Sequence, residues 1–252
     1  MLSNILPAEI FAFLLITVRL APLIMVVPIF GERSIPQRVR VGFAMMLAMV
    51  IYPTLSSSMP PMPTSPIALA AIFFKEMSIG LLIGLTMRIL MSAMHTAGSV
   101  IAFQTGLSAV QAFDPSQGTQ SVVVAALLNL IATVMILATN LHHLMLRGMV
   151  YSYDKFPVTD TLVMADFASV AVTFVSSSFL LGFQIASPFI VYAMIYNLSL
   201  GLIARMVQGF QVFFVGMPIN LFMGFFLTMS LLSSIMNLFL GRFREHLLAV
   251  IG

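Results

Sequence analysis

The sequence predicts an all-α integral membrane protein with about six apolar helical segments, several kinked or broken into hairpins, and a central re-entrant loop. Of the 252 residues, 60% are hydrophobic and only 8% are charged, whereas soluble domains carry about 25% charged residues. The apolar residues form long runs, and prolines and glycines interrupt several of these runs. A soluble fold of this size could not bury so much apolar surface, so most of the chain must face lipid or other protein.

The charge pattern and the missing cysteines exclude several classes of function. The 11 basic residues are spread singly and give a net charge of only +3, which argues against nucleic-acid binding. There is no cysteine, so disulfides and thiolate metal sites are excluded. The sequence also lacks an HExxH, P-loop, GxSxG or dinucleotide-binding motif. We therefore expect no enzymatic activity, no catalytic or metal-binding residues and no cofactor.

The first half of the chain contains three apolar runs, at residues 10–30, 41–56 and 67–94. The first run is preceded by Glu9 and by no basic residue, which favours an uncleaved helix over a signal peptide. The second run is short for a bilayer core that needs about 20 helical residues. The connection at 53–66 is rich in proline and serine and reads as a tight polar loop.

The second half contains apolar runs at residues 121–146, 167–204 and 206–240. As single helices, the last two would be about 57 Å and 52 Å long, well beyond the bilayer core of about 30 Å. Each contains residues that disturb helices, which predict kinks or hairpins at three positions. These predicted helix breaks are Pro188, Gly216 and Pro218.

The basic residues do not give a consistent orientation for six spans. Residues 31–40 carry three arginines, and residues 241–252 are also basic, so both would be expected on the cytoplasmic side. Five spans between them would place them on opposite sides. Either the number of spans differs from six, or charge does not orient this chain.

Four charged residues fall within the apolar runs and a fifth lies between the last two runs, where charge is costly and marks function or contacts between helices. They could form a proton relay, but we favour inter-subunit or interhelical polar contacts. Lys75 and Glu76 are neighbours, so on a helix they point about 100° apart and each needs a partner elsewhere. The "GLLIG" pattern from Gly80 to Gly84 permits close helix contact. The five residues are Arg19, Lys75, Glu76, Arg88 and Arg205.

Amide side chains are spread over the last three runs. They could line a wet path, but such amides more often join helices by hydrogen bonds worth about 1 kcal/mol or less. We interpret them as interhelical contacts. They are Asn129, Asn140, Gln184, Asn197, Asn220 and Asn237.

The stretch "QTGLSAVQAFDPSQGTQ", residues 104–120, separates the third and fourth apolar runs. At membrane depth, irregular backbone must be covered by protein or face a water-filled cavity. Asp114 and Pro115 are typical of a turn, and Gly118 tolerates positive φ. From the residues alone, a re-entrant plug and a surface turn are equally supported. Apolar residues interrupt the stretch at Leu107, Val110 and Phe113.

Four motifs, in order along residues 15 to 235, resemble the FliR family of flagellar export-gate proteins, which is related to the SctT proteins of injectisomes. "PIFGERSIPQRVRVGFAMMLA" resembles the first basic loop and second helix of that family, and "FKEMSIGLLIGLTMRIL" resembles its third apolar segment. "AFDPSQGTQS" is similar to its central loop. "NLSLGLIARMVQGFQVFFVGMPINLFMGFF" is similar to its C-terminal signature.

The resemblance implies a single export-gate domain over residues 1–252, with N-terminal helices (1–103), a plug-like loop (104–120) and C-terminal helices (121–252). It implies a subunit of the flagellar type III export gate that helps form and close a protein-conducting pore for unfolded flagellar subunits. The residues that it places in the plug are Gly106, Leu107, Val110, Phe113, Asp114, Pro115, Gln117 and Gly118.

The implied partners are FliP-like and FliQ-like membrane proteins in one hetero-oligomer, FlhB-like and FlhA-like export proteins, the unfolded substrates and the lipid bilayer. The implied location is the bacterial inner membrane within the flagellar basal body, with part of the helical material raised above the membrane plane. That arrangement would explain both the long helices and the inconsistent charge pattern. A secondary transporter for a small solute and a passive membrane scaffold are the alternatives.

Overall fold

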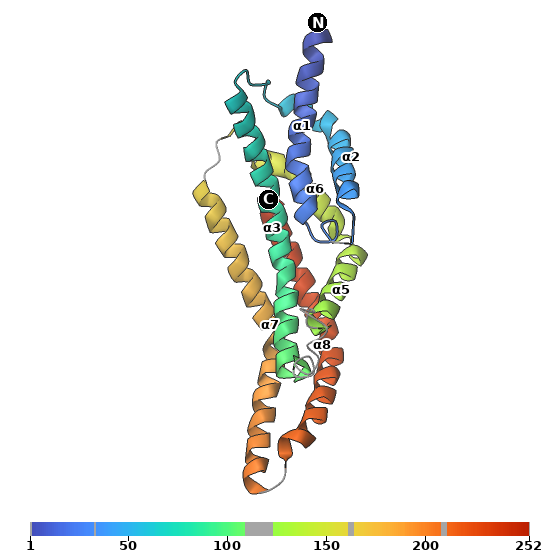
Figure 1. Cartoon of the computed structure of the whole chain (residues 1–252), viewed down its shortest axis with the longest axis vertical. Coiled ribbons are helices and arrows are strands. Elements are labelled where there is room, and N and C mark those ends of the chain that lie inside the picture. The colour runs from blue at the N-terminus through green and yellow to red at the C-terminus, as the bar shows by residue number, and fades with distance from the viewer. Residues whose placement is uncertain (1, 33, 109–122, 161–163, 208–210, 252) are drawn as a thin grey trace. The chain divides into compact units, whose positions relative to one another are not determined.

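The computed structural model describes residues 2–32, 34–108, 123–160, 164–207 and 211–251, and helices account for most of them (Figure 1). No strand occurs among these described residues. The elements are α1 (Leu2–Val26), α2 (Gln37–Leu55), the short 3₁₀ helix η1 (Ser56–Ser58), α3 (Pro66–Gln104), α5 (Val123–Ala138), α6 (Leu141–Lys155), α7 (Met164–Met206) and α8 (Val212–Ile251).

Within the described ranges, five helices are long and apolar enough to cross a membrane, and α5 together with α6 makes a sixth candidate span. These two helices are bent by 75° at a break. Asn140 lies in the break with φ of 59°, a left-handed conformation that asparagine tolerates better than most residues. The predicted all-α membrane fold is therefore confirmed, and the fourth apolar run is divided into two helices.

Helices α7 and α8 each continue as one element through the three residues predicted to kink or interrupt them. Pro188 lies inside α7, and Gly216 and Pro218 lie inside α8. A proline removes one N–H from the helix, but hydrogen bonds on either side of it hold the helix together. Each helix is therefore one element, of 43 residues in α7 and 40 in α8.

The chain divides into two compact units, and each gathers segments from distant parts of the sequence. Unit 1 contains residues 1–89, 140–175 and 243–252. Unit 2 contains residues 90–139 and 176–242.

Unit 1 has its core around α1, whose apolar residues are buried on most sides. Leu15, Ile16 and Leu20 are completely buried. Helix α2 packs beside α1 (Figure 1), and its Ala44 and Ala48 are completely buried. Two small residues one turn apart on α2 permit this close packing.

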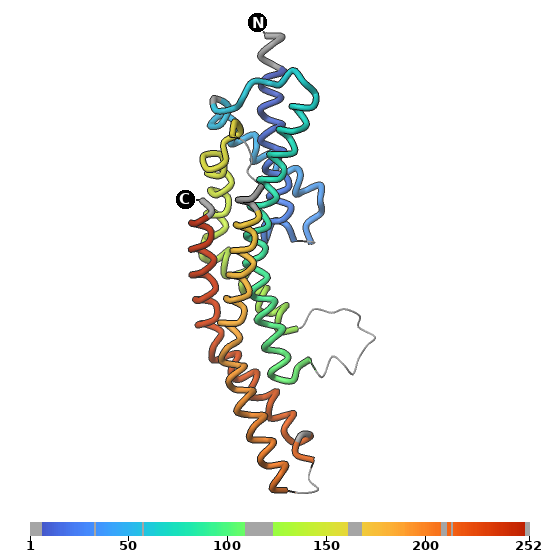
Figure 2. Tube along the Cα trace, turned by 90° about the vertical axis from the view of Figure 1, so that its left-hand side faces the viewer, coloured from blue at the N-terminus to red at the C-terminus, as the bar shows by residue number. Residues whose placement is uncertain are grey.

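Unit 2 combines the second part of α3 with α5 and the paired portions of α7 and α8. Within this unit α7 and α8 run side by side, as two views at right angles show (Figure 2). Gly98 of α3 faces the backbone of Ala125 in α5, so closely that a side chain at Gly98 would overlap it. The buried side of α5 follows one helical face, with Ala125, Leu128 and Ala132 completely buried.

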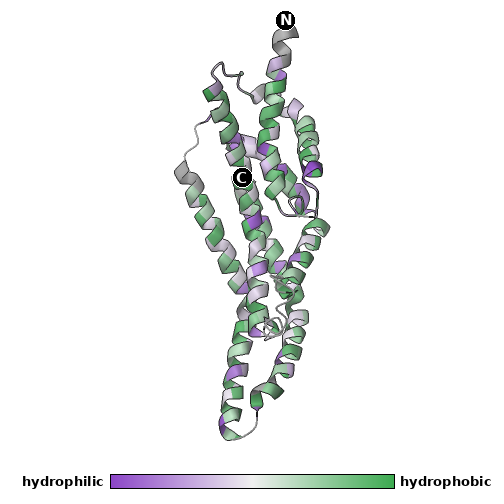
Figure 3. Ribbon diagram, in the orientation of Figure 1, coloured by the Kyte–Doolittle hydropathy of each residue, from purple (hydrophilic) through white to green (hydrophobic). Residues whose placement is uncertain are grey.

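Large apolar side chains also cover much of the exposed surface. Figure 3 shows hydrophobic residues along all the long helices. The exposed fraction reaches 84% at Met206, 79% at Met229 and 74% at Phe214. These side chains require lipid or protein around them, because an aqueous solvent would leave a large apolar surface exposed.

Candidate functional site

A buried ion pair joins α1 to α3 in unit 1. Nε of Arg19 lies 2.5 Å from Oε2 of Glu76, and Nη2 of Arg19 lies 3.0 Å from Oε1. Both side chains are completely buried. This geometry is bidentate, which is the strongest arrangement between a guanidinium and a carboxylate.

The carbonyl oxygens at the end of α6 complete the surroundings of Arg19. Nη1 of Arg19 donates to the carbonyl of Ser152 at 3.0 Å and contacts its hydroxyl at 3.5 Å. Nη2 also donates to the carbonyl of Phe156 at 2.9 Å. With the two contacts to Glu76, all five guanidinium N–H groups have an acceptor.

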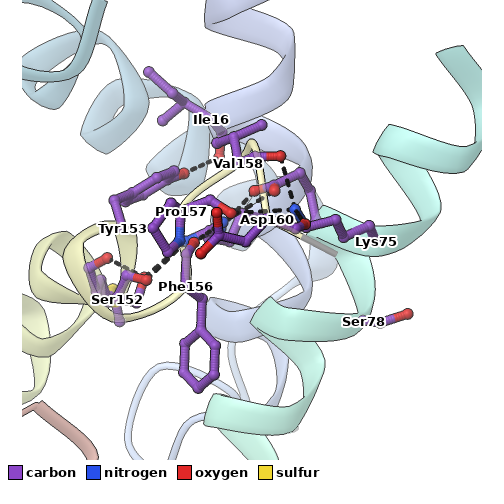
Figure 4. A network of polar contacts seen from close by, with 12 residues as sticks. Ile16, Lys75, Ser78, Ser152, Tyr153, Phe156, Pro157, Val158 and Asp160 are labelled. Atoms are coloured by element: carbon purple, nitrogen blue, oxygen red, sulfur yellow. Dashed lines mark hydrogen bonds and ion pairs between the residues drawn. The ribbon is translucent and has the colours of Figure 1, made fainter. Parts of the chain in front are cut away.

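The ring of Tyr153 covers the guanidinium, with Cζ of Arg19 lying 3.9 Å from the ring centroid. Figure 4 shows Tyr153, Ser152 and Phe156 gathered at this point. A desolvated cation–π contact of this kind adds about 2 kcal/mol. We call Arg19, Glu76, Ser152, Tyr153 and Phe156 the arginine clasp, because together they hold α1, α3 and the end of α6.

The close approach of α1 and α3 depends on glycines placed one turn apart. A side chain at Gly80 would overlap the carbonyl of Arg19, and a Cβ at Gly84 would lie 3.0 Å from the carbonyl of Leu23. Because Glu76, Gly80 and Gly84 are spaced by four residues, they share one face of α3. The glycine pattern predicted close contact, and here it brings the backbones near enough for the clasp to form.

Among the described residues, Lys75 contacts backbone carbonyls of the connection after α6. Its Nζ lies 2.7 Å from the carbonyl of Val158 and 3.1 Å from that of Pro157, and it also contacts the carbonyl of Asp160. An ammonium group has three N–H donors, which match these three acceptors. The side chain is half-buried, and Figure 4 shows it directed at this connection.

The other two charged residues lie at the surface. Arg88 is exposed, and its Nη1 lies 3.4 Å from the carbonyl of Val26 at the end of α1. Arg205 is exposed in the last turn of α7, where a positive charge stabilises the helix dipole. Of the five predicted residues, the structure thus brings Arg19 and Glu76 together and leaves Arg88 and Arg205 on the surface.

In unit 2, Asn220 of α8 connects two other helices. The hydroxyl of Tyr192 in α7 donates to Oδ1 of Asn220 at 3.0 Å. Nδ2 of Asn220 donates to the carbonyl of Gln104, the last residue of α3, at 3.4 Å. This asparagine therefore makes the interhelical contacts that the sequence predicted for the amides.

Most of the predicted plug residues lie outside the described part of the chain. Gly106 has φ of 77°, in the left-handed region that ends many helices, and Leu107 is half-buried. The other six are Val110, Phe113, Asp114, Pro115, Gln117 and Gly118. In the described residues, no three histidines or acids come together to hold a metal ion.

Comparison with known proteins decides the family. Residues 10–246 match the family described as bacterial export proteins, family 1. The chain belongs to the FliR family. The flagellar biosynthetic protein FliR of Caulobacter vibrioides is 36% identical over 239 residues, which cover 95% of both chains. FliR of Escherichia coli is 32% identical over 234 residues, covering 92% of this chain and 87% of that protein.

A third relative also matches over most of the chain. FliR of Bacillus subtilis is 31% identical over 227 residues, covering 89% of this chain and 87% of that protein. A member of the FliR family is a multi-pass flagellar export-gate membrane protein and not an enzyme. The predicted family, class of function and membrane location are therefore confirmed.

Sequence reasoning missed the acceptors and the aromatic ring of the clasp. Ser152 and Phe156 contribute backbone carbonyls, which any residue type could supply. Tyr153 gave no signal either, because it lies outside the six apolar runs. One pattern could have helped: Gly80 follows Glu76 by one turn, so the carboxylate projects from the face that approaches another helix.

Proposed function

We propose that this chain is a wall subunit of a flagellar protein-conducting pore and that residues 104–120 close the pore. In this proposal the chain assembles with FliP-like and FliQ-like subunits, and FlhB-like and FlhA-like proteins attach to the assembly. Unfolded flagellar subunits pass through the pore. The relationship to FliR proteins over nearly the full length supports the proposal.

The length and apolar surface of α7 and α8 carry the argument for partner subunits. At 43 and 40 residues, each helix is about 60 Å along its axis. Fitting that length into a core of about 30 Å would need a tilt of about 60°, whereas membrane helices tilt by at most about 40°. Parts of both helices must therefore extend beyond the lipid, and other subunits would cover the apolar side chains there.

The exposed apolar residues occur along both helices and not only over one bilayer thickness. On α7 the exposed fraction is 60% at Leu180 and 84% at Met206. On α8 it is 74% at Phe214 and 48% at Leu248. This distribution supports a hetero-oligomer that is partly raised above the membrane plane.

The positions of the ionisable groups favour a role as a pore wall and argue against a solute transporter. A coupled transporter needs an ion or substrate site near the membrane midplane. Glu76, the buried acid that could serve, already accepts two hydrogen bonds from Arg19. Arg88, the other candidate, is exposed and contacts a backbone carbonyl.

Deleting residues 107–117 tests the proposed closure. The deletion should leave assembly with the FliP-like and FliQ-like subunits intact and should make the closed gate conduct ions, measured as conductance of the purified complex in planar bilayers. As a control, residues 59–64 before α3 are replaced by glycine and serine, which should not change conductance. Unchanged conductance after the deletion would remove the plug role. Solute uptake by the purified chain alone would favour a transporter.

A further inference from the structure

The turn that ends α3, residues 104–106, receives a hydrogen bond from a side chain of α8. Nδ2 of Asn220 donates to the carbonyl of Gln104 at 3.4 Å. The last carbonyls of a helix have no partner within it and need one from elsewhere. Asn220 supplies such a partner at the point where the chain leaves α3.

The amide of Asn220 is oriented by a second hydrogen bond. Its Oδ1 accepts from the hydroxyl of Tyr192 in α7 at 3.0 Å. An amide has an acceptor on one side and donors on the other, so fixing the oxygen toward Tyr192 turns the nitrogen toward Gln104. Aspartate has nearly the same shape but has no donor to offer when ionised. The chemistry of this position therefore requires an amide.

Packing around the turn fits the same arrangement. Gly106 has φ of 77°, and a Cβ there would lie 3.4 Å from Nδ2 of Asn220. One turn further along α8, a Cβ at Gly224 would lie 2.6 Å from that of Thr105. Asn220 and Gly224 therefore form one face of α8 against which the turn lies, and Gly224 leaves the space that Thr105 occupies.

A second hydrogen bond joins α7 to α8, one helical turn away from the bond between Tyr192 and Asn220. The hydroxyl of Tyr196 donates to the carbonyl of Gly216 at 2.5 Å, and its ring stacks on that of Tyr192 at a centroid distance of 5.7 Å. Residues 192 and 196 thus match residues 220 and 216 in an antiparallel register. Because Tyr196 also holds this register, a change at Asn220 can release the turn without separating the two helices.

We propose that Asn220 is a positioning residue that transmits the register of the α7–α8 hairpin to the turn at residues 104–106. Its effect on conductance rests on the proposed function, because residues 104–120 begin at this turn. A shift of α8 along α7 would move the donor away from the Gln104 carbonyl and free the turn. While this hydrogen bond is intact, the α7–α8 hairpin and the start of the proposed plug form one connected element.

The natural absence of cysteine allows a direct test in the assembled gate. Ser108→Cys places a single thiol just after the turn, and its rate of labelling by a water-soluble maleimide reports how often this region opens. Asn220→Asp keeps the acceptor for Tyr192 and loses the donor to Gln104. We expect labelling to accelerate about fivefold, the effect of losing one hydrogen bond. Asn237→Asp, at an exposed position of α8, is the matched control and should not change the rate.

Ion conductance of the same complexes separates the two proposals. Faster labelling together with a leak supports both the positioning role and the plug. Faster labelling without a leak supports the positioning role and counts against the plug. An unchanged labelling rate in Asn220→Asp overturns the positioning role, whatever the conductance. If that variant does not assemble, Tyr192→Phe replaces it: about a twofold acceleration supports the proposal, and a rate equal to the control overturns it.

Discussion

Arg19 and Glu76 form a two-point ion pair in which Nε lies 2.5 Å and Nη2 lies 3.0 Å from the two carboxylate oxygens, with both side chains completely buried. The pair connects α1 with α3 through two residues that are 57 positions apart in the sequence. Because water cannot replace a lost partner there, each charge depends on the other.

Glu76→Gln should destabilise the protein strongly. The substitution keeps the shape of the side chain but leaves the guanidinium of Arg19 buried without its counter-charge, at a cost of about 3–5 kcal/mol. The thermal unfolding temperature in detergent and the yield of assembled complex should both fall. Glu9→Gln, at an exposed position of α1, should change neither. A Glu76→Gln variant as stable as Glu9→Gln would show that the clasp contributes little.

The double variant Arg19→Met with Glu76→Leu makes the reason for that loss testable. If the unpaired charge causes the damage, removing both charges should be less harmful than removing Glu76 alone. Unfolding temperatures of the two single variants and the double variant form a double-mutant cycle, which should give a coupling above about 1 kcal/mol. Additive losses would argue against direct coupling.

Gly80→Ala should separate α1 from α3. The added Cβ would overlap the carbonyl of Arg19, and a backbone carbonyl cannot rotate away as a flexible side chain can. We expect a loss of more than about 2 kcal/mol, measured as a lower unfolding temperature. Gly42→Ala is the matched control, because a Cβ at Gly42 meets nothing within 4 Å. Alanine there should raise helix stability by up to about 1 kcal/mol.

Lys75→Met should have a smaller and more local effect. Lys75 is half-buried and holds backbone carbonyls of the connection after α6, so its loss removes hydrogen bonds without leaving a buried charge unpaired. We expect about 1–2 kcal/mol of destabilisation. Hydrogen–deuterium exchange of residues 156–160 should accelerate, while exchange in α1 stays unchanged. Equal acceleration in α1 would mean that Lys75 supports the whole clasp.

The helical architecture was predictable from the sequence because apolar runs identify membrane helices directly. The predicted run at 167–204 corresponds to α7 at Met164–Met206, within a few residues at each end. The effect of the prolines on the long helices was less predictable. A proline removes one hydrogen bond whether a helix bends or continues, and at Pro188 and Pro218 the helix continues. The interruption at Asn140 depends on a positive φ, which the apolar run around it does not predict.

The sequence identified which charged residues make polar contacts, but it did not identify their partners. A charge in an apolar run must be paired, so Arg19 and Glu76 were recognisable as contact residues. The sequence did not show that they meet each other, because nothing local links α1 with α3. The partners of Lys75 were harder to predict, because they are the backbone carbonyls of Pro157, Val158 and Asp160. Every residue type has such a carbonyl, so the sequence does not mark these positions.

The arginine clasp also constrains how the chain can be made. Glu76 follows Arg19 by 57 residues. Ser152 and Phe156, whose carbonyls also accept from Arg19, follow Arg19 by 133 and 137 residues. The ribosome therefore delivers an arginine in the first transmembrane segment long before it delivers the groups that neutralise it. During that interval an unpaired arginine would cost about 2.5–3.5 kcal/mol of insertion free energy, and α3 offsets this cost when it supplies Glu76.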